Sequence, residues 1–462
     1  MEAIDIEKGC GLGIHELLKD AIALEESADP QDADPGVEGE DSDNDEVPAP
    51  SIPVDPKIGS LNLPGDTPPN AVPQSRANRQ RKRKREAEIL KYGYRPSPIG
   101  LKRHVRMAAS VKTDLDVKDL PATSCGYAAT GHTPPKPALP AAIQALVDQG
   151  YEVVKNDGKT CKVFVGPDNR IFAVAAGQPC DPTYKEDHDD VCRAFLDVGA
   201  RLRYRDSELN HKRGDFPAVN IGVTHSRGTK HPVFLKSDHQ EAIDELLEMK
   251  GLQRMAKFAN GAFSLSPASM HIRNPLIAAF ATWAPNLYSY YKRYTDDLFE
   301  KMPKLRRIFG GKSVFPCVAF NFGPRVCTVS HRDQLNLSFG WCSIQALGWF
   351  DPERGGHLVL DDIKKIIEFP AGSLILIPSA TLIHRNLPVQ DHEVRMSFTQ
   401  FCSGGIFRFV DNGFRTQNEL KEQDPQACRE IMEKKKSRWN LGLSLWSKLS
   451  DVVQVVPELA AM

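Results

Sequence analysis

The sequence predicts an α+β fold in which a sandwich or barrel of short strands is flanked by helices. After Phe315, short apolar runs alternate with turns that contain Gly or Pro, a pattern typical of all-β sandwiches and barrels. The expected strands of this part are 318–322, 342–350, 357–360, 366–369, 373–377, 381–384 and 394–401. Elsewhere, helical spacing of apolar residues or strand-like composition predicts helices at 141–149, 189–202, 240–258, 276–302 and 417–449 and strand at 160–174.

The first part of the chain has a composition that cannot form a packed core. Residues 27–45 are almost all Asp, Glu, Gly, Pro, Ala and Ser, and residues 47–73 are rich in proline. Such a segment buries too little apolar surface to offset the entropy of ordering it, so we expect a disordered leader. The partly apolar stretch 14–24 could form one or two turns of helix.

The net charge of −1 conceals an acidic leader and a basic body. Residues 1–70 contain 18 Asp/Glu and 3 Lys/Arg, whereas the rest of the chain contains 42 acidic and 56 basic residues. A basic body favours a polyanionic partner such as DNA or RNA, although a solvated lysine-rich surface gives the same balance. Six of the seven residues 79–85 are basic, which predicts a nuclear import signal or a nucleic-acid-binding arm, and hence a nucleus-located protein.

Several classes of protein are disfavoured by the sequence. No apolar run reaches the ~18 residues of a membrane-spanning helix, and the first residues lack the pattern of a secretory signal. The ten cysteines form no C-x-x-C pair, which disfavours a structural zinc site of common spacing and indicates reduced thiols. We therefore expect no membrane association, and the oligomeric state stays open.

The segment His331-Arg332-Asp333 carries two metal-ligating side chains two residues apart. Residues two apart on a strand share a face, so both side chains can point at one ion. His384 follows His331 by 53 residues, at the end of another expected strand. Two histidines and one carboxylate form the facial triad that suits Fe(II) and leaves positions open for O₂ and a bidentate co-substrate. The sequence thus predicts an iron site at His331, Asp333 and His384.

Arg395 and Ser397 form a second pair of residues that share a strand face. A guanidinium and a hydroxyl together can hold a carboxylate, which is what the far end of 2-oxoglutarate requires. Taken singly, His384 could be a core histidine and Arg395 a surface arginine. The H-x-D motif also recurs at His188-Asp189-Asp190, which we interpret as a solvated helix start because it lies in an acidic helical stretch. The ordered set of motifs, however, favours a dioxygenase.

These motifs resemble those of the 2-oxoglutarate oxygenases, whose core is a double-stranded β-helix, a jelly-roll, cupin-like barrel. Within that group the chain is similar to the TET/JBP family, which oxidises methyl groups on DNA bases, and especially to its fungal branch. The similarity covers about residues 210–415. It rests on the segments 331–336 (HRDQLN), 355–360 (GGHLVL), 370–377 (PAGSLILI), 395–405 (RMSFTQFCSGG) and 409–414 (FVDNGF).

The resemblance implies roles for individual residues. His331, Asp333 and His384 would bind Fe(II), while Arg395, supported by Ser397, would bind 2-oxoglutarate. The chemistry would be oxidation of a substrate methyl group with O₂, at a base flipped out of the duplex.

The same resemblance points to substrate contacts. Asn336 would hydrogen-bond the flipped base and Phe401 would stack on it, with 5-methylcytosine the expected base and 5-hydroxymethylcytosine the first product. Ser403 stands where animal and amoeboid members carry a base-contacting histidine. The base preference therefore stays open toward others such as N6-methyladenine. Basic residues near the domain start would hold phosphates: Lys212, Arg213, Arg227 and Lys230.

We expect five parts along the chain. They are a disordered acidic and proline-rich leader (1–73), a basic segment with the import signal (74–110), an N-terminal α/β extension (111–205), a TET/JBP-like dioxygenase domain (206–415) and a C-terminal helical tail (416–462). Two other functions stay open. One is hydroxylation of a protein side chain with the same triad, and the other is a non-catalytic cupin-like binding module.

Overall fold

The computed structural model describes residues 105, 107–130, 142–179, 181–225, 229–235, 237–260, 278–310 and 313–454. All of them belong to the compact unit Lys84–Met462. The expected leader, the basic run 79–85 and the short helix at 14–24 lie outside the described residues, so they stay predictions. Among the described helices, none has the length and apolar character needed to cross a membrane.

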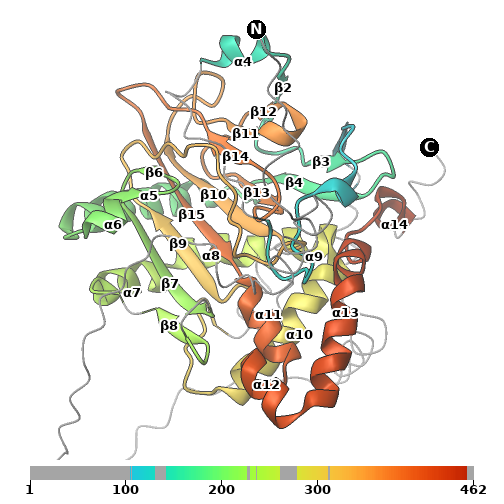
Figure 1. Cartoon of the computed structure of the whole chain (residues 1–462). Helices are drawn as coiled ribbons and strands as arrows, with labels where there is room; N and C mark the ends of the chain where they lie inside the picture. The colour runs from blue at the N-terminus through green and yellow to red at the C-terminus, as the bar shows by residue number, and fades with distance from the viewer. Residues whose placement is uncertain are drawn as a thin grey trace, which may run out of the picture. The chain divides into compact units, whose positions relative to one another are not determined.

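The described strands form two main sheets (Figure 1). The larger sheet has nine strands in the order β1-β3-β4-β13-β10-β15-β9-β7-β8, and only β1 and β3 pair in parallel. Its strands are β1 (Ala109–Lys112), β3 (Lys162–Val165), β4 (Ile171–Gly177), β7 (Ala218–Thr224), β8 (Val233–Leu235), β9 (Cys317–Asn321), β10 (Cys342–Trp349), β13 (Leu374–Ile377) and β15 (Val394–Phe401).

The smaller sheet has four strands in the order β14-β11-β12-β2. These are β2 (Glu152–Val154), β11 (Leu358–Leu360), β12 (Lys365–Ile367) and β14 (His384–Asn386), and the 3-10 turn η4 (Asp361–Ile363) links β11 to β12. A separate hairpin consists of β5 (Asn210–His211) and β6 (Gly214–Asp215). The strands β2, β3 and β4 come from the expected N-terminal extension, whereas β1 spans its start at residue 111. Together they continue both sheets of the barrel.

From β9 to β15 the chain alternates between the two sheets. β9, β10, β13 and β15 lie in the larger sheet, whereas β11, β12 and β14 lie in the smaller one. Between β9 and β10, His331 joins the smaller sheet by an antiparallel bridge to His384. This alternation is the winding of a double-stranded β-helix. The predicted fold class, a jelly-roll core flanked by helices, is confirmed.

The core strands are apolar on both faces because both faces are covered. Leu374, Ile375, Leu376 and Ile377 of β13 are all fully buried, and they pair with β10 on one side and β4 on the other. Side chains of β11, β12 and β13 belong to one apolar cluster together with the aromatic residues of the helices. A continuous apolar run is therefore the sequence pattern of this buried strand.

The helices surround the sheets, and α8 and α9 lie behind the strands in this view (Figure 1). Before β9 come η2 (Val117–Asp119), α4 (Ile143–Val147), α5 (Tyr184–Arg201), α6 (Asp206–Leu209), α7 (Gln240–Glu248), α8 (Lys250–Ala259), α9 (Ala279–Trp283) and α10 (Pro285–Lys301). After β15 come α11 (Gly404–Asp411), α12 (Gln417–Gln423), α13 (Pro425–Ser444) and α14 (Leu449–Gln454). A second apolar cluster joins α5, α7 and α8 to β7, β9 and β15.

The two longer helices expected before the barrel are each broken in two, and the expected helix 417–449 is divided into α12, α13 and the start of α14. The expected helix 240–258 is interrupted at Met249, which is extended with φ −61° and ψ 127°. The break lets α8 approach α5 so closely that a Cβ on Gly251 would lie 2.7 Å from Asp187 O. The described part of 276–302 is interrupted at Ala284, because the residue before a proline is disfavoured in helical geometry.

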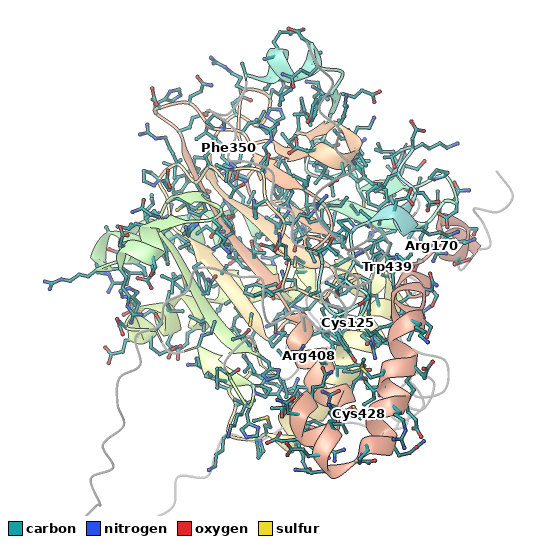
Figure 2. The ribbon with its side chains drawn as sticks, in the orientation of Figure 1. Cys125, Arg170, Phe350, Arg408, Cys428 and Trp439 are labelled. Atoms are coloured by element: carbon teal, nitrogen blue, oxygen red, sulfur yellow. The ribbon has the colours of Figure 1, made fainter. Side chains whose placement is uncertain are left out.

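The C-terminal helix α13 is fastened to the N-terminal extension. The Arg438 guanidinium donates to Cys125 O at 2.8 Å and lies over the Tyr127 ring, 4.1 Å from its centroid. Arg170, which precedes β4, donates to Trp446 O at 3.3 Å just beyond the end of α13. Figure 2 labels Cys125 and Arg170 together with Trp439 of α13. The N-terminal extension and the C-terminal helix α13 are thus joined by direct contacts.

We predict that Gly348→Ala destabilises the barrel. Gly348 in β10 has φ +120°, and a Cβ there would lie 2.0 Å from Val394 O of the neighbouring strand. Positive φ and backbone overlap together should lower the free energy of unfolding by at least about 2 kcal/mol. Thermal or denaturant unfolding measures the loss. Gly310→Ala is the control, because its φ is +75° but no described atom lies within 4 Å of the added Cβ. Equal stability of the two variants would contradict the prediction.

Candidate functional site

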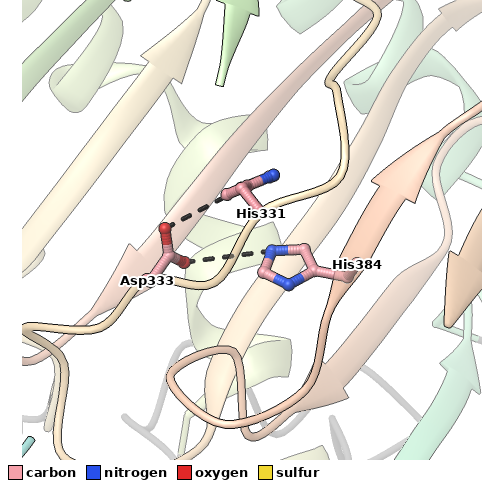
Figure 3. Close-up of side chains that lie close together, drawn as sticks. All are labelled: His331, Asp333 and His384. Atoms are coloured by element: carbon pink, nitrogen blue, oxygen red, sulfur yellow. Dashed lines mark ion pairs between the residues drawn. The ribbon is translucent and has the colours of Figure 1, made fainter. Parts of the chain in front are cut away.

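The structure brings His331, Asp333 and His384 together in one cluster (Figure 3). His331 Nε2 lies 3.8 Å from Asp333 Oδ1, and His384 Nε2 lies 4.0 Å from Asp333 Oδ2. One potential ligand atom from each residue lies within 4.8 Å of the other two. These separations exceed ordinary hydrogen-bond lengths and suit three ligands that share one metal ion.

The two histidines are held side by side by backbone pairing. His331 N donates to His384 O at 3.1 Å, and His384 N donates to His331 O at 3.0 Å. Their ring centroids lie 4.3 Å apart. Asp333 is fixed separately, because its backbone N donates to Ser379 O at 2.9 Å in the turn that follows β13. Three segments of the jelly roll thus meet at the cluster.

The hydrogen bonds of the imidazoles select the tautomer that a metal needs. His331 Nδ1 lies 2.7 Å from Val329 O, and His384 Nδ1 lies 3.0 Å from Leu382 O. A ring nitrogen next to a carbonyl oxygen must be the protonated donor, so each Nε2 carries the lone pair. Both lone pairs are on the atoms that face Asp333. The donor set therefore fits Fe(II), which two imidazoles and a carboxylate bind in a facial triad.

Burial and neighbouring charges favour the metal-binding protonation states. Burial, with His384 nearby, lowers the pKa of His331 to about 3, so the imidazole stays neutral. Burial alone would raise the pKa of Asp333. Interactions with His331, His384 and Arg213 and a hydrogen bond from Ser379 nevertheless hold that pKa below its ordinary value. Near neutral pH the cluster therefore contains a neutral His331 imidazole beside the Asp333 carboxylate.

Two adjacent acids, Asp361 and Asp362 of η4, fasten the segments that carry the histidines. Asp362 accepts hydrogen bonds from Arg332 Nη2 at 3.0 Å and from Ile383 N at 2.5 Å. These two donors belong to residues adjacent to His331 and His384. The Asp362 carboxylate therefore links the two histidine segments by hydrogen bonds that are separate from the backbone pair between His331 and His384.

Asp361 makes a matching link one residue earlier. It accepts from Ser330 Oγ at 2.8 Å and from Arg385 Nη2 at 3.2 Å. Tyr151 OH of the N-terminal extension also donates to Asp361, at 2.9 Å. Outer contacts of this kind set the orientation of ligand histidines, and their loss typically weakens metal binding. The sequence analysis missed both acids, whose only signal was an acidic pair directly after a buried strand.

Arg395 is a buried guanidinium that lacks a carboxylate partner among the described residues. It is 2% exposed, and its Nε has no hydrogen-bond partner there. Its Nη1 donates only to the backbone oxygen of Val326, at 3.3 Å. Burial lowers the pKa of Arg395 to about 10, which still leaves it charged near neutral pH. A buried and unpaired cation is costly, so its geometry indicates a site for an anionic ligand.

Ser397 lies on the same strand face as Arg395 and is also buried. It accepts a hydrogen bond from Asn321 Nδ2 at 3.0 Å, across the pair of strands β15 and β9. Asn321 Oδ1 is buried and has no partner among the described residues. Sequence reasoning missed Asn321, although a single polar residue at the end of an apolar strand was a usable signal. Arg395, Ser397 and Asn321 together fit the far carboxylate of 2-oxoglutarate.

Asn336 is buried next to the metal ligands. Its Nδ2 lies 3.3 Å from both Ser379 Oγ and Cys342 Sγ, and Ser379 in turn hydrogen-bonds Asp333. Among the described residues, Asn336 Oδ1 accepts no hydrogen bond. Asn336 also forms an antiparallel bridge with Ser403, two residues beyond the end of β15. Phe401 closes β15 and is partly exposed, on the same strand face as Arg395 and Ser397.

Arg213 lies in the tight turn between β5 and β6. We predicted that it contacts phosphate together with Lys212, Arg227 and Lys230, and this role stays a prediction. The Arg213 carbonyl accepts from Val329 N at 2.8 Å, two residues before His331. Burial lowers the pKa of its guanidinium, against a raising effect of Asp333. Arg213 thus acts on the metal centre electrostatically. Arg227 lies outside the described residues.

The second H-x-D motif does not belong to the site, and its predicted environment was wrong. His188 lies within α5 and is 6% exposed, so it is not a solvated helix start. Its Nε2 lies 3.3 Å from Cys192 Sγ and its Nδ1 lies 3.2 Å from Asp189 Oδ1. Cys192 also accepts from Gly348 N of β10 at 3.1 Å. These contacts dock α5 on the larger sheet, which the local acidic composition did not reveal.

We predict that His331→Ala, Asp333→Ala or His384→Ala removes tight divalent-metal binding. Two remaining donors cannot form the facial triad, so the affinity should fall by more than the ~100-fold typical of changes outside the ligand set. Calorimetric titration with Mn(II) or Co(II) measures this without oxygen chemistry. His392→Ala, at an exposed histidine, is the control. Unchanged metal affinity of His384→Ala would rule out the triad.

We also predict that Asp362→Asn weakens metal binding while the fold is retained. The neutral amide cannot bind Arg332 as a carboxylate does, so the histidine segments lose part of their support. The metal affinity should fall by about 10–100-fold. The same titration and circular dichroism test this. Asp391→Asn is the matched control, because Asp391 also pairs with an arginine but is fully exposed.

Comparisons with known proteins complete the description of the site. No protein-family model and no curated protein matches the chain. Among solved structures, "NgTET1 in complex with 5mC DNA" has 13% identity and a TM-score of 0.37, over 71% of this chain and 96% of that one. A 2OG-Fe(II) oxygenase family oxidoreductase from Burkholderia pseudomallei has 18% identity and a TM-score of 0.25, over 47% and 78%. The viral collagen prolyl hydroxylase of Paramecium Bursaria Chlorella virus-1 has 17% identity and a TM-score of 0.15, over 18% and 55%. Because these scores are low, we base the proposed function on the site geometry.

Proposed function

We propose that this chain is an Fe(II)- and 2-oxoglutarate-dependent dioxygenase that oxidises methyl groups on DNA bases, with 5-methylcytosine the expected base. One observation carries the dioxygenase activity. A His-Asp-His cluster with both Nε2 lone pairs facing the carboxylate lies in the same jelly roll as a buried, unpaired arginine. A metal site alone fits many functions. An uncompensated Arg395 in addition calls for an anionic co-substrate.

Different residues bind the metal and the co-substrate. Iron with 2-oxoglutarate and O₂ supplies the oxidising power for hydroxylation of a methyl group. His331, Asp333 and His384 would hold the metal, which would supply the site where the co-substrate and O₂ react. Arg395 and Ser397 receive the far carboxylate of 2-oxoglutarate, and this contact fixes the orientation of the co-substrate toward the metal.

Asn336 and Phe401 support a flipped base as the substrate. Asn336 Nδ2 is held by Ser379 and Cys342, while Oδ1 is available to accept from an exocyclic amino group such as N4 of cytosine. Phe401 could stack on the same ring, which is worth about 1–3 kcal/mol per base in other systems. The histidine expected from the family at position 403 is a buried serine. Its Oγ accepts from His225 N at 3.4 Å and so is engaged with the protein.

The charge distribution supports a nucleic-acid partner over a protein substrate. Beyond residue 70, the chain carries 56 basic and 42 acidic residues. Such an excess favours a phosphate backbone and adds a salt-dependent attraction. The basic run 79–85 supports a nuclear location within the same proposal. A protein side-chain hydroxylase needs the same triad and arginine, and it is the second candidate.

We predict that Arg395→Lys weakens 2-oxoglutarate binding while metal binding persists. Lysine keeps the charge but cannot make a bidentate contact, and a charge-assisted contact of this kind contributes roughly 1.5–3 kcal/mol. The Kd of 2-oxoglutarate for the Mn(II)-loaded protein should rise about ten- to hundredfold in calorimetry. Arg293→Lys, at an exposed arginine of α10, is the control. An unchanged Kd would remove Arg395 from the co-substrate site.

We predict that Asn336→Ala lowers oxidation of methylated DNA far more than it lowers 2-oxoglutarate turnover without DNA. The reason is that Asn336 meets the base, whereas the metal and the co-substrate are held by other residues. Nucleoside mass spectrometry of 5-methylcytosine and N6-methyladenine substrates is paired with a succinate assay. Asn286→Ala, at an exposed asparagine of α10, is the control.

Two outcomes would change the proposal. Succinate formation by the wild type without oxidation of any methylated base, in duplex or single strand, would reject the DNA substrate and favour the protein hydroxylase. Absence of succinate formation by the iron-loaded wild type would reject the dioxygenase and favour a cupin-like binding module.

A further inference from the structure

Leu335 is an exposed apolar residue inside the segment that carries the metal site. Its side chain is 48% exposed, and every other residue from 326 to 348 is buried or partly buried. It lies two residues after the ligand Asp333 and directly before Asn336. A single exposed leucine is common on protein surfaces and needs no explanation by itself. Leu335 differs from other exposed leucines in its position beside the metal cluster and in the hydrogen bonds that fix its backbone.

The backbone around Leu335 is fixed from three sides. Asn336 N donates to Asp333 O at 2.9 Å and closes a tight turn with Gln334 and Leu335 at its tip. Gln334 O accepts from Ala129 N of the N-terminal extension, at 2.9 Å. Leu335 O accepts from Gly404 N at the start of α11, at 2.8 Å. The turn therefore presents an apolar side chain to solvent from a backbone that cannot retract it.

We propose that Leu335 is a wedge that enters the stack of duplex DNA when the target base is flipped into the site. The inference rests on the proposed function and deepens it, because it assigns the partner as a base-paired duplex and not a single strand. Flipping leaves a gap in the stack and costs unstacking energy. Proteins that distort DNA fill such gaps with apolar side chains such as Leu, Ile, Met or Phe.

The positions of Leu335, Asn336 and Asp333 in one turn are consistent with a wedge beside the flipped base. Asn336, which would meet the flipped base, is adjacent to Leu335, and Asp333 holds the metal on the other side of the same turn. A base drawn toward Asn336 therefore leaves its gap close to the residue next to Asn336. Gly404, which anchors Leu335, follows Ser403, the residue bridged to Asn336. The wedge and the base contact are thus held by the same pair of backbone segments, 335–336 and 403–404.

The experiment compares Leu335→Ala, Leu335→Phe and wild type on three DNA substrates with the same methylated sequence. These are a single strand, a matched duplex and a duplex with an abasic site opposite the target. Leu335→Ala should lower the ratio of duplex to single-strand oxidation rates by about tenfold or more, the loss expected when the cost of opening is no longer offset. The abasic duplex should restore the oxidation rate of Leu335→Ala, because its target base is unpaired. Leu335→Phe should behave like the wild type on all three substrates. Leu441→Ala, at a leucine of α13 that is 53% exposed, is the control.

A second measurement does not depend on turnover. 2-Aminopurine at the target position of a duplex brightens when it leaves the stack, so its fluorescence on binding reports flipping without iron. Wild type should raise the signal, and Leu335→Ala should raise it much less at saturating protein. Equal fluorescence and an equal duplex-to-single-strand ratio for the two proteins would overturn the wedge while the proposed function stands. A wild type that acts on single strands alone would do the same. A wild type that oxidises no DNA would overturn both.

Discussion

The site depends on one backbone contact, the bridge between His331 and His384. These residues are 53 positions apart, yet they exchange both backbone hydrogen bonds, at 3.1 and 3.0 Å. Such a pair holds its Cα atoms about 5.5 Å apart, so the two imidazoles must lie side by side. Each Nδ1 then binds a nearby backbone carbonyl, and both Nε2 atoms face Asp333. Without the bridge, His384 would belong to a loop separate from the segment that carries His331 and Asp333.

Much of the surrounding structure serves to hold that bridge in place. Asp361 and Asp362 connect the neighbours of both histidines through charged hydrogen bonds. Tyr151 reaches Asp361 from the N-terminal extension, whose strand β2 pairs with β12. The extension is therefore structurally part of the metal site, although it contributes no ligand. This explains how a segment without a recognisable motif can be integral to the barrel that carries the His-Asp-His cluster.

The electrostatics of the interior are arranged for occupancy by anions. Arg395 is buried without a carboxylate partner among the described residues, and Arg213 lies near enough to Asp333 to influence its pKa. A buried guanidinium without a carboxylate partner, such as that of Arg395, is unfavourable until a ligand supplies negative charge. Binding of an anionic ligand should thus contribute to the stability of the folded barrel, because a ligand that binds only the native state shifts the folding equilibrium toward it.

The sequence by itself predicted where the barrel strands lie along the chain, which residues form the triad, and that Arg395 and Ser397 share a strand face, because these depend on local patterns such as two-residue periodicity and fixed spacing. The expected strand 381–384 shows where such patterns stop: pairing with β11 begins only at His384, and the preceding residues form a turn. Only the tertiary structure decided the surroundings of each group. Asn321, Asp361 and Asp362 carry no motif. Local composition assigned Arg213 to a phosphate contact and His188 to solvent. Their burial and partners depend on segments distant in sequence, and such contacts leave no periodic trace in a single chain.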